Sequence, residues 1–188
     1  VEEWRSFNYT YLVAFHPDQR AKVLELLGED ADENANFQLA LKKAAKETSE
    51  LNGVDQFFAF YNYGTNLVNL RDYAGAAKAY DTAFALYDAL PQDMSIRPYR
   101  ILWYQTGPFF AYYYTGRYGD VINKATANSI EMVRDDAPAL EESYYWRGMA
   151  KLQLGEQQSA IEDFYTCLQY HAGFSVCLKA LNDLGINP

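Results

Sequence analysis

Asp163, Cys167 and His171 follow one another at intervals of four residues near the end of the chain. On a helix this spacing places three side chains on one face, where they would imitate the acid, nucleophile and base of a hydrolase. The neighbouring sequence offers no second histidine and no oxyanion element. A thiol buried in apolar surroundings has a raised pKa and is inert. We therefore favour a packing role for Cys167, and the sequence predicts no catalytic residue.

A second candidate for chemistry is the acidic segment that contains Asp30, Asp32 and Asn34. Their spacing matches the first three ligands of a calcium loop, which also requires Gly at its sixth position and Glu at its twelfth. Those positions hold Ala35 and Leu41. The segment is therefore expected to be an acidic turn that caps the following helix. We expect no metal site and no cofactor.

A helix-turn-helix pattern recurs along most of the chain. It occupies Phe57–Leu90, Arg100–Arg134 (where the pattern itself ends at Ala127) and Glu141–Phe174. The three segments align on Gly64, Gly107 and Gly148. Aromatic residues precede each of these glycines, and a turn and a second helix with a small residue follow it. Such pairs of helices bury their apolar faces by stacking on one another.

This pattern resembles the tetratricopeptide repeat, with its W-x₂-L-G-x₂-Y…A-x₃-F…P signature. An alanine and a ring four residues later match its A-x₃-F part, and a small residue follows three positions after the ring: Ala76, Tyr80 and Ala83, and likewise Ala160, Phe164 and Cys167. The resemblance implies an all-α, right-handed superhelical solenoid over residues 17–188, with a capping helix over 175–184. The second repeat departs from the pattern, because nine residues separate Gly107 from its turn glycine where the third repeat has seven.

In tetratricopeptide arrays the first helices of the repeats line a concave groove that binds peptides. Counted from the repeat glycine, the corresponding residues here are Tyr61, Asn62, Thr65, Tyr104, Gln105, Tyr145, Trp146 and Met149. Tyrosine rings beside amide groups suit an extended peptide, because the rings pack on its side chains while the polar groups meet its backbone. The alternative is that these rings only pack against one another between the helices.

A narrower resemblance covers almost the whole chain. The segments WRSFNYTYLVAFHPDQRAKVLELLG, YNYGTNLVNLRDYAGAA, LWYQTGPFFAYYYTGRYGDVI and EESYYWRGMA are similar to the C-terminal region of bacterial papain-like, double-glycine-type peptidase proteins. The resemblance implies that the catalytic Cys and His lie upstream of this chain and that the parent protein is exported. The chain would then be either a protein-binding scaffold or a structural spacer or regulatory cover for the peptidase domain.

The N-terminal segment reads differently from the rest. Residues 7–15 (FNYTYLVAF) alternate with a period of two and are rich in aromatic residues, which predicts a strand. The rest of the chain offers no partner strand. We interpret residues 1–16 as the remnant of an upstream domain, or as a segment that covers the first helices or pairs with a second copy to form a homodimer.

Composition restricts the partners. Of the 188 residues, 49% are hydrophobic, and the formal net charge of -9 repels nucleic acid and anionic lipid. No apolar run is long enough to span a bilayer. The sequence thus favours a non-catalytic scaffold whose partner is a protein or peptide.

Two local features remain. Pro108 predicts a kinked or opened helix, because proline offers no N–H to the carbonyl four residues earlier. Cys167 and Cys177 lie on consecutive helices and are either bridged or two separate small core residues, of which the second reading is favoured from the sequence.

Overall fold

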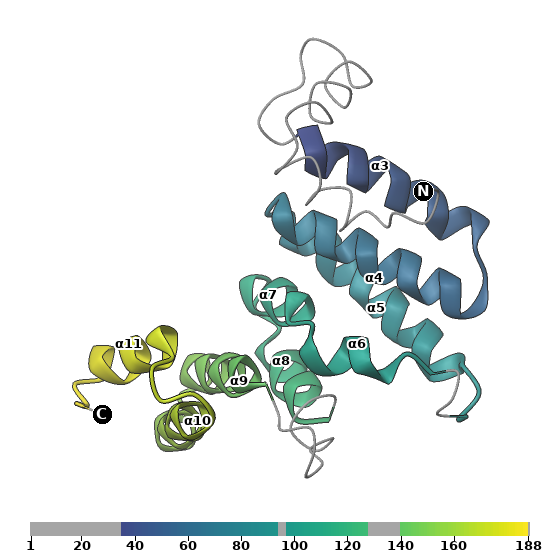
Figure 1. Ribbon diagram of the computed structural model, residues 1–188. Helices are drawn as coiled ribbons and strands as arrows, with labels where there is room; N and C mark the ends of the chain where they lie inside the picture. Colours follow the sequence, from purple (N-terminus) through teal and green to yellow (C-terminus); the bar gives the residue numbers. More distant parts are fainter. Residues whose placement is uncertain (1–34, 94–96, 128–139, 188) are drawn as a thin grey trace. The chain divides into compact units, whose positions relative to one another are not determined.

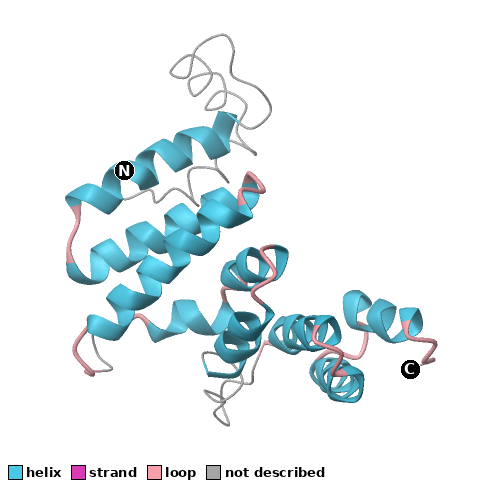
Figure 2. Cartoon of the chain, turned by 180° about the vertical axis from the view of Figure 1, so that it is seen from behind, coloured by secondary structure: helices cyan, strands magenta, loops and turns pink. Residues whose placement is uncertain are grey.

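The computed structural model describes residues 35–93, 97–127 and 140–187, apart from the side chains of residues 35–40, Trp103 and Tyr104. Within these ranges the chain forms nine helices and no strand (Figure 2). The all-α prediction is therefore confirmed. The expected strand over 7–15, the acidic turn before Ala35 and any dimer through the N-terminal segment lie outside the described residues.

The chain divides into two compact units, Val1–Arg97 and Pro98–Pro188, where the sequence predicts one continuous solenoid from residue 17. The first unit contains α3 (Ala35–Glu50), α4 (Gly53–Asn69) and α5 (Tyr73–Ala89). Helix α4 packs against both α3 and α5 (Figure 1).

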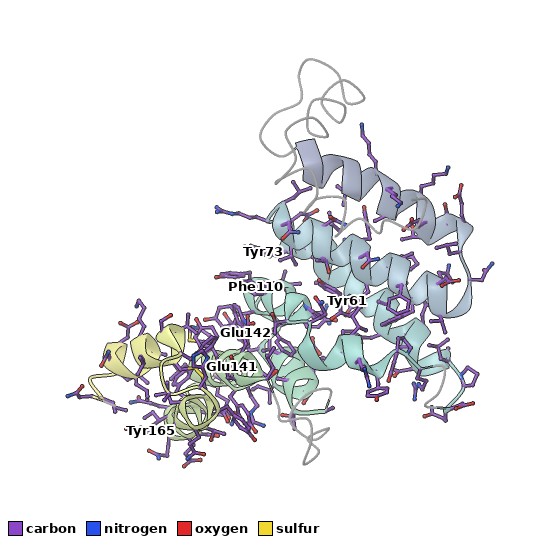
Figure 3. The ribbon with its side chains drawn as sticks, in the orientation of Figure 1. Tyr61, Tyr73, Phe110, Glu141, Glu142 and Tyr165 are labelled. Carbon is purple, nitrogen blue, oxygen red and sulfur yellow. A yellow bond between two sulfur atoms is a disulfide. The ribbon has the colours of Figure 1, made fainter. Side chains whose placement is uncertain are left out.

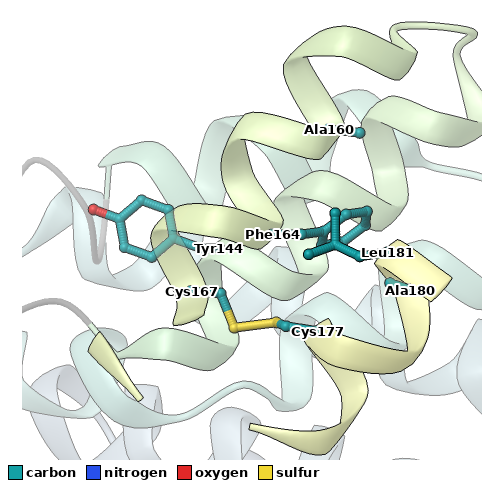
Figure 4. Close-up of a cluster of buried hydrophobic side chains, with 7 residues drawn as sticks. All are labelled: Tyr144, Ala160, Phe164, Cys167, Cys177, Ala180 and Leu181. Atoms are coloured by element: carbon teal, nitrogen blue, oxygen red, sulfur yellow. A yellow bond between two sulfur atoms is a disulfide. The ribbon is translucent and has the colours of Figure 1, made fainter. Parts of the chain in front are cut away.

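The second unit contains the remaining helices: α6 (Tyr99–Tyr104), α7 (Gly107–Tyr114), α8 (Tyr118–Ala125), α9 (Glu141–Gln153), α10 (Gln157–Tyr170) and α11 (Ser175–Asp183). Helices α7 and α8 pack together, α8 packs on α9, α9 on α10, and α10 on α11. Apolar side chains of α9, α10 and α11 form one buried cluster around Phe164 and Leu181 (Figure 4).

The helical hairpins α4–α5 and α9–α10 share one packing design. Gly64 faces the ring of Tyr80, and a Cβ atom added to Gly64 would lie 2.9 Å from that ring. Gly148 faces Phe164 in the same way, with a corresponding distance of 2.6 Å. Equivalent residues of the two hairpins lie 84 positions apart, as Gly64 and Gly148 do. In each hairpin the missing side chain of glycine lets a large ring fit between the two helices.

The turns between paired helices also repeat, and they fix the register. The residue that reverses the chain has a positive φ in all three pairs: 62° at Arg71, 75° at Gly116 and 81° at Gly155. In each turn the next N–H donates to a carbonyl five residues earlier, at distances of 2.8 to 2.9 Å. This hydrogen bond is the one that closes a Schellman-type helix end.

The register set by the turns corrects the predicted alignment of the second repeat. Gly64 and Gly148 precede their turn residues by seven positions, and the residue seven before Gly116 is Phe109, not Gly107. The place of the large ring, nine positions after the turn residue, is taken by Ala125. Phe109 and Ala125 are both buried. The large residue is therefore on the first helix and the small one on the second, the reverse of the other two hairpins, so a search for glycine does not find this register.

Arg71 adopts the left-handed conformation that glycine holds in the other two turns. A side chain in this region costs about 1 kcal/mol relative to glycine. We expect Arg71→Gly to raise the free energy of unfolding by about that amount, and Gly155→Ala to lower it similarly, as measured by urea denaturation. An unchanged stability in both variants would contradict the strain argument.

The kink predicted at Pro108 is not present, and the chain instead forms two helices with a break just before the proline. Helix α6 ends at Tyr104, Gln105 is extended (φ -108°, ψ 110°), and α7 begins at Gly107. Pro108 lies in the first turn of α7, where the N–H that it lacks has no intrahelical partner. The helix is therefore opened upstream of the proline and not bent around it.

Candidate functional site

The predicted groove residues of the first repeat lie inside a hairpin. Tyr61 is 1% exposed, and its ring packs on Tyr80 and Phe84 with centroid distances of 5.1 and 6.4 Å. Tyr61 belongs to α4 and is labelled in Figure 3. In this position Tyr61 contributes to the core of the first unit and offers no surface to a peptide.

Thr65 and Asn62 are half-buried beside it. The Thr65 hydroxyl lies 3.1 Å from the Tyr80 hydroxyl and also donates to the carbonyl of Tyr61 at 3.1 Å. Burial raises the pKa of Tyr80 far above its usual value, and the hydrogen bond with Thr65 opposes this only in part. Tyr80 therefore remains a neutral hydroxyl, and the pair satisfies polar atoms that the core would otherwise leave unpaired.

The second-repeat candidates are Tyr104 and Gln105. The side chain of Tyr104 is not among those described, and Gln105 is exposed in the break between α6 and α7. By the register of the turns, the residue equivalent to Tyr61 and Tyr145 is Thr106. Tyr104 is therefore not the residue that corresponds to Tyr61 and Tyr145 in this register, and the predicted set of three equivalent tyrosines depended on aligning Gly107 with the repeat glycines.

The third-repeat candidates do come together with other rings. Trp146 of α9 is 4% exposed and lies at the centre of an aromatic cluster. Its ring centroid is 4.3 Å from Phe110, 5.3 Å from Tyr145, 5.4 Å from Tyr113 and 6.3 Å from Tyr114. We call these five residues the α7–α9 aromatic cluster.

Polar atoms at the edge of the cluster are fixed. The indole Nε1 of Trp146 donates to Glu142 Oε1 at 3.1 Å, and the amide of Gln153 donates to the Tyr113 hydroxyl at 3.2 Å. Burial raises the pKa of Tyr113 and of Tyr145, and the neighbouring tyrosines add to this rise. The hydroxyl groups therefore stay protonated at neutral pH and can donate as well as accept.

The rings of the cluster differ in their exposure to solvent: Phe110, Tyr113 and Tyr145 are half-buried, and Tyr114 is the most exposed. Tyr114 is 55% exposed, the largest exposure among the bulky apolar or aromatic side chains of the described residues. Met149, the remaining candidate, is half-buried and packs instead against the core of α9, α10 and α11. The cluster thus combines a buried indole with an exposed tyrosine.

The sequence prediction missed Phe110, Tyr113 and Tyr114. Their signal is the segment FFAYYY at residues 109–114, which places five rings within six residues of one short helix. A helix with rings on every side must pack them against more than one neighbour. The prediction chose Tyr104 because it aligned Gly107, and not Phe109, with Gly64 and Gly148.

The acid, thiol and imidazole pattern of α10 does not form a catalytic group. Cys167 is joined to Cys177 in a disulfide, which corrects the preferred reading of two separate cysteines. The Nδ1 atom of His171 lies 3.3 Å from Glu141. Cys167 is thus bonded to Cys177 and His171 lies beside Glu141, so neither is paired with another member of the Asp163, Cys167 and His171 pattern.

The third member, Asp163, is the centre of a buried ion network. It is 3% exposed, and both its oxygens accept hydrogen bonds from the Arg147 guanidinium, at 2.6 and 2.9 Å. The ammonium of Lys151 lies 2.8 Å from Oδ2. Arg147 also donates to the Thr126 hydroxyl at 3.2 Å and so ties α9 to the end of α8. These contacts give Asp163 a structural role.

Across the described residues, no group of three or more His, Cys, Asp or Glu side chains is placed to hold a metal ion. None of the described helices combines the length and apolar character that crossing a bilayer requires. Comparison with known proteins adds no identity: no family model matches the chain, and neither a curated protein nor a solved structure is significantly similar to it.

Proposed function

We propose that this chain is a non-catalytic scaffold that binds an extended segment of another protein through the α7–α9 aromatic cluster. The observation that carries the proposal is the arrangement around Trp146, where four rings from two helices surround one indole. Rings that are already packed lose little conformational freedom on binding, so they anchor a partner at a low entropic cost.

The polar edge of the cluster supports an extended peptide as the ligand. Protonated tyrosine hydroxyls and the exposed ring of Tyr114 supply both hydrogen bonds and apolar contact, which suits a backbone with alternating side chains. Aromatic residues of this kind dominate the binding energy of protein interfaces.

We further propose that the hairpins belong to a tetratricopeptide-like, right-handed solenoid. The support is internal: α4–α5 and α9–α10 share the glycine-to-ring contact and the turn, at a constant offset along the chain. In this proposal the rings of the first hairpin pack the core, and those of α7 and α9 make the binding surface. The resemblance to peptidase-associated regions would place the chain beside a cysteine-peptidase domain, as scaffold or as spacer.

Selection from a random peptide library displayed on phage tests the binding function. The best selected peptide is then titrated against the wild type and two variants that each remove an exposed tyrosine. Tyr114→Ala is expected to weaken binding by about 1–2 kcal/mol, the scale of an aromatic anchor. Tyr165→Ala, on α10 and 41% exposed, should leave the dissociation constant within about twofold.

Two results would contradict the proposal. Equal weakening by both variants would show that the cluster is not the site. Failure of any peptide to enrich over an unrelated helical protein would favour the structural spacer instead.

A further inference from the structure

The C-terminal helix α11 is joined to α10 by the disulfide between Cys167 and Cys177 (Figure 4). Cys167 lies in the last turn of α10 and Cys177 in the first turn of α11, with 6.6 Å between their Cα atoms. Neither residue has any exposed surface. The bond is therefore sealed inside the cluster that also contains Phe164 and Leu181.

The first hairpin supplies an internal comparison. The residue equivalent to Cys167 is Ala83, which is equally buried. Packing of the hairpin therefore requires a small residue at this position and does not require sulfur. The residue equivalent to Cys177 is Asp93, which is exposed after the end of α5. Cysteine therefore occurs in the α9–α10 hairpin, which is followed by α11, and there a disulfide can link that helix to the hairpin.

Helix α11 has few other means of staying in place. It contains nine residues, and no side chain caps its N-terminus. Besides Cys177, its buried side chains are Ala180 and Leu181. Three partly buried residues on its flanks also pack against the same cluster: Phe174, Leu184 and Ile186. A helix this short is unstable without tertiary contacts, and terminal segments with few contacts open most readily.

We infer that the Cys167–Cys177 bond is a permanent clasp, that is, a covalent link that holds α11 against α10, and that this chain matures in an oxidising compartment. Closing the bond removes two electrons and two protons from the two thiols. They pass to the disulfide of a thiol oxidoreductase or of oxidised glutathione, which becomes two thiols. Because both sulfurs are buried after docking, the exchange takes place while α11 is undocked. The docked helix then shields the bond from reducing thiols.

The compartment is tested with the full chain produced in two ways: exported to a bacterial periplasm, and retained in a reducing cytoplasm. Free thiols are alkylated in urea and counted by mass spectrometry. The exported chain should contain none and the cytoplasmic chain two. Glutathione should reduce the native exported chain at least about 100-fold more slowly than the same chain in urea, since α11 must first undock. Free thiols in the exported chain, or complete bridging in the cytoplasm, would overturn the inference.

The clasp itself is tested by amide hydrogen exchange. The double variant Cys167→Ala, Cys177→Ala removes the disulfide, and its first change introduces the residue that the first hairpin has at Ala83. In this variant the amides of α11 should lose their protection from exchange, while those of α9 should keep it. Val176→Ala changes an exposed neighbour on the same helix and should leave protection unchanged. Full protection of α11 in the double variant would show that the helix needs no clasp.

Discussion

Replacing Asp163 with Ala is expected to lower the free energy of unfolding by about 3 kcal/mol, because the guanidinium of Arg147 and the ammonium of Lys151 would lose their shared counter-charge inside the protein. The expected loss lies at the lower end for a buried pair, since the side chains of Arg147 and Lys151 retain 17% and 14% exposure. Urea denaturation of the full chain measures it. Asp120→Ala is the control, because it breaks the exposed pair with Arg117 and should cost less than about 1 kcal/mol.

The first hairpin shows how the same positions are filled without charge. The residues equivalent to Arg147, Lys151 and Asp163 are Tyr63, Leu67 and Ala79. Replacing a buried ion network as a whole by apolar residues is often neutral or stabilising. We therefore expect the triple variant Arg147→Tyr, Lys151→Leu, Asp163→Ala to be more stable than Asp163→Ala alone. A triple variant less stable than the single one would contradict the equivalence of the hairpins.

Truncating Phe164 to Ala is expected to cost about 3–5 kcal/mol, because the ring fills the space between α9 and α10 and is fully buried. Tyr165→Ala removes a ring of similar size from the exposed neighbouring position and should cost much less. The difference in urea midpoint between these adjacent variants isolates the effect of burial. Similar losses would mean that the core does not depend on Phe164.

The effect of Gly148→Ala on the free energy of unfolding should change sign according to whether Phe164 is present or has been replaced by Ala. In the wild type, Gly148→Ala brings its Cβ atom within 2.6 Å of the ring and should cost about 1–3 kcal/mol. With Phe164 already replaced by Ala the collision is gone, and the higher helix propensity of alanine should make Gly148→Ala stabilising by up to about 1 kcal/mol. Additive effects in this double-mutant cycle would exclude direct contact.

The helices and the pairing of glycine with a ring were predictable because they depend on local periodicity. Gly64 with Tyr80, and Gly148 with Phe164, follow one rule at one spacing. The second repeat has a large residue, Phe109, where the other two have glycine, so its register follows from the backbone at Gly116 and not from the residue types. A pattern search that expects glycine selects Gly107 and shifts the repeat by two residues.

The candidate site was predictable only in part, because burial depends on neighbours outside the repeat. Tyr61 and Tyr145 occupy equivalent positions, but the ring of Tyr61 packs on rings of its own hairpin, whereas Tyr145 contacts Trp146, whose ring packs on rings of α7. The ion network was also missed, since Asp163 lies 16 residues from Arg147 and is one of two adjacent acidic residues on α10, Glu162 and Asp163. The sequence did contain one signal for the network, because Asp163 stands where the first hairpin has Ala79.

The most direct test of the proposed function is to map the binding surface. Titration of the ¹⁵N-labelled chain with the peptide selected by phage display reports, through ¹⁵N–¹H correlation spectra, which backbone amides the peptide affects. We predict that the shifting resonances belong to α7 and α9, with the largest changes around Tyr114 and Trp146. Shifts confined to α10 and α11, or to residues 35–93, would contradict the assignment of the aromatic cluster as the binding site.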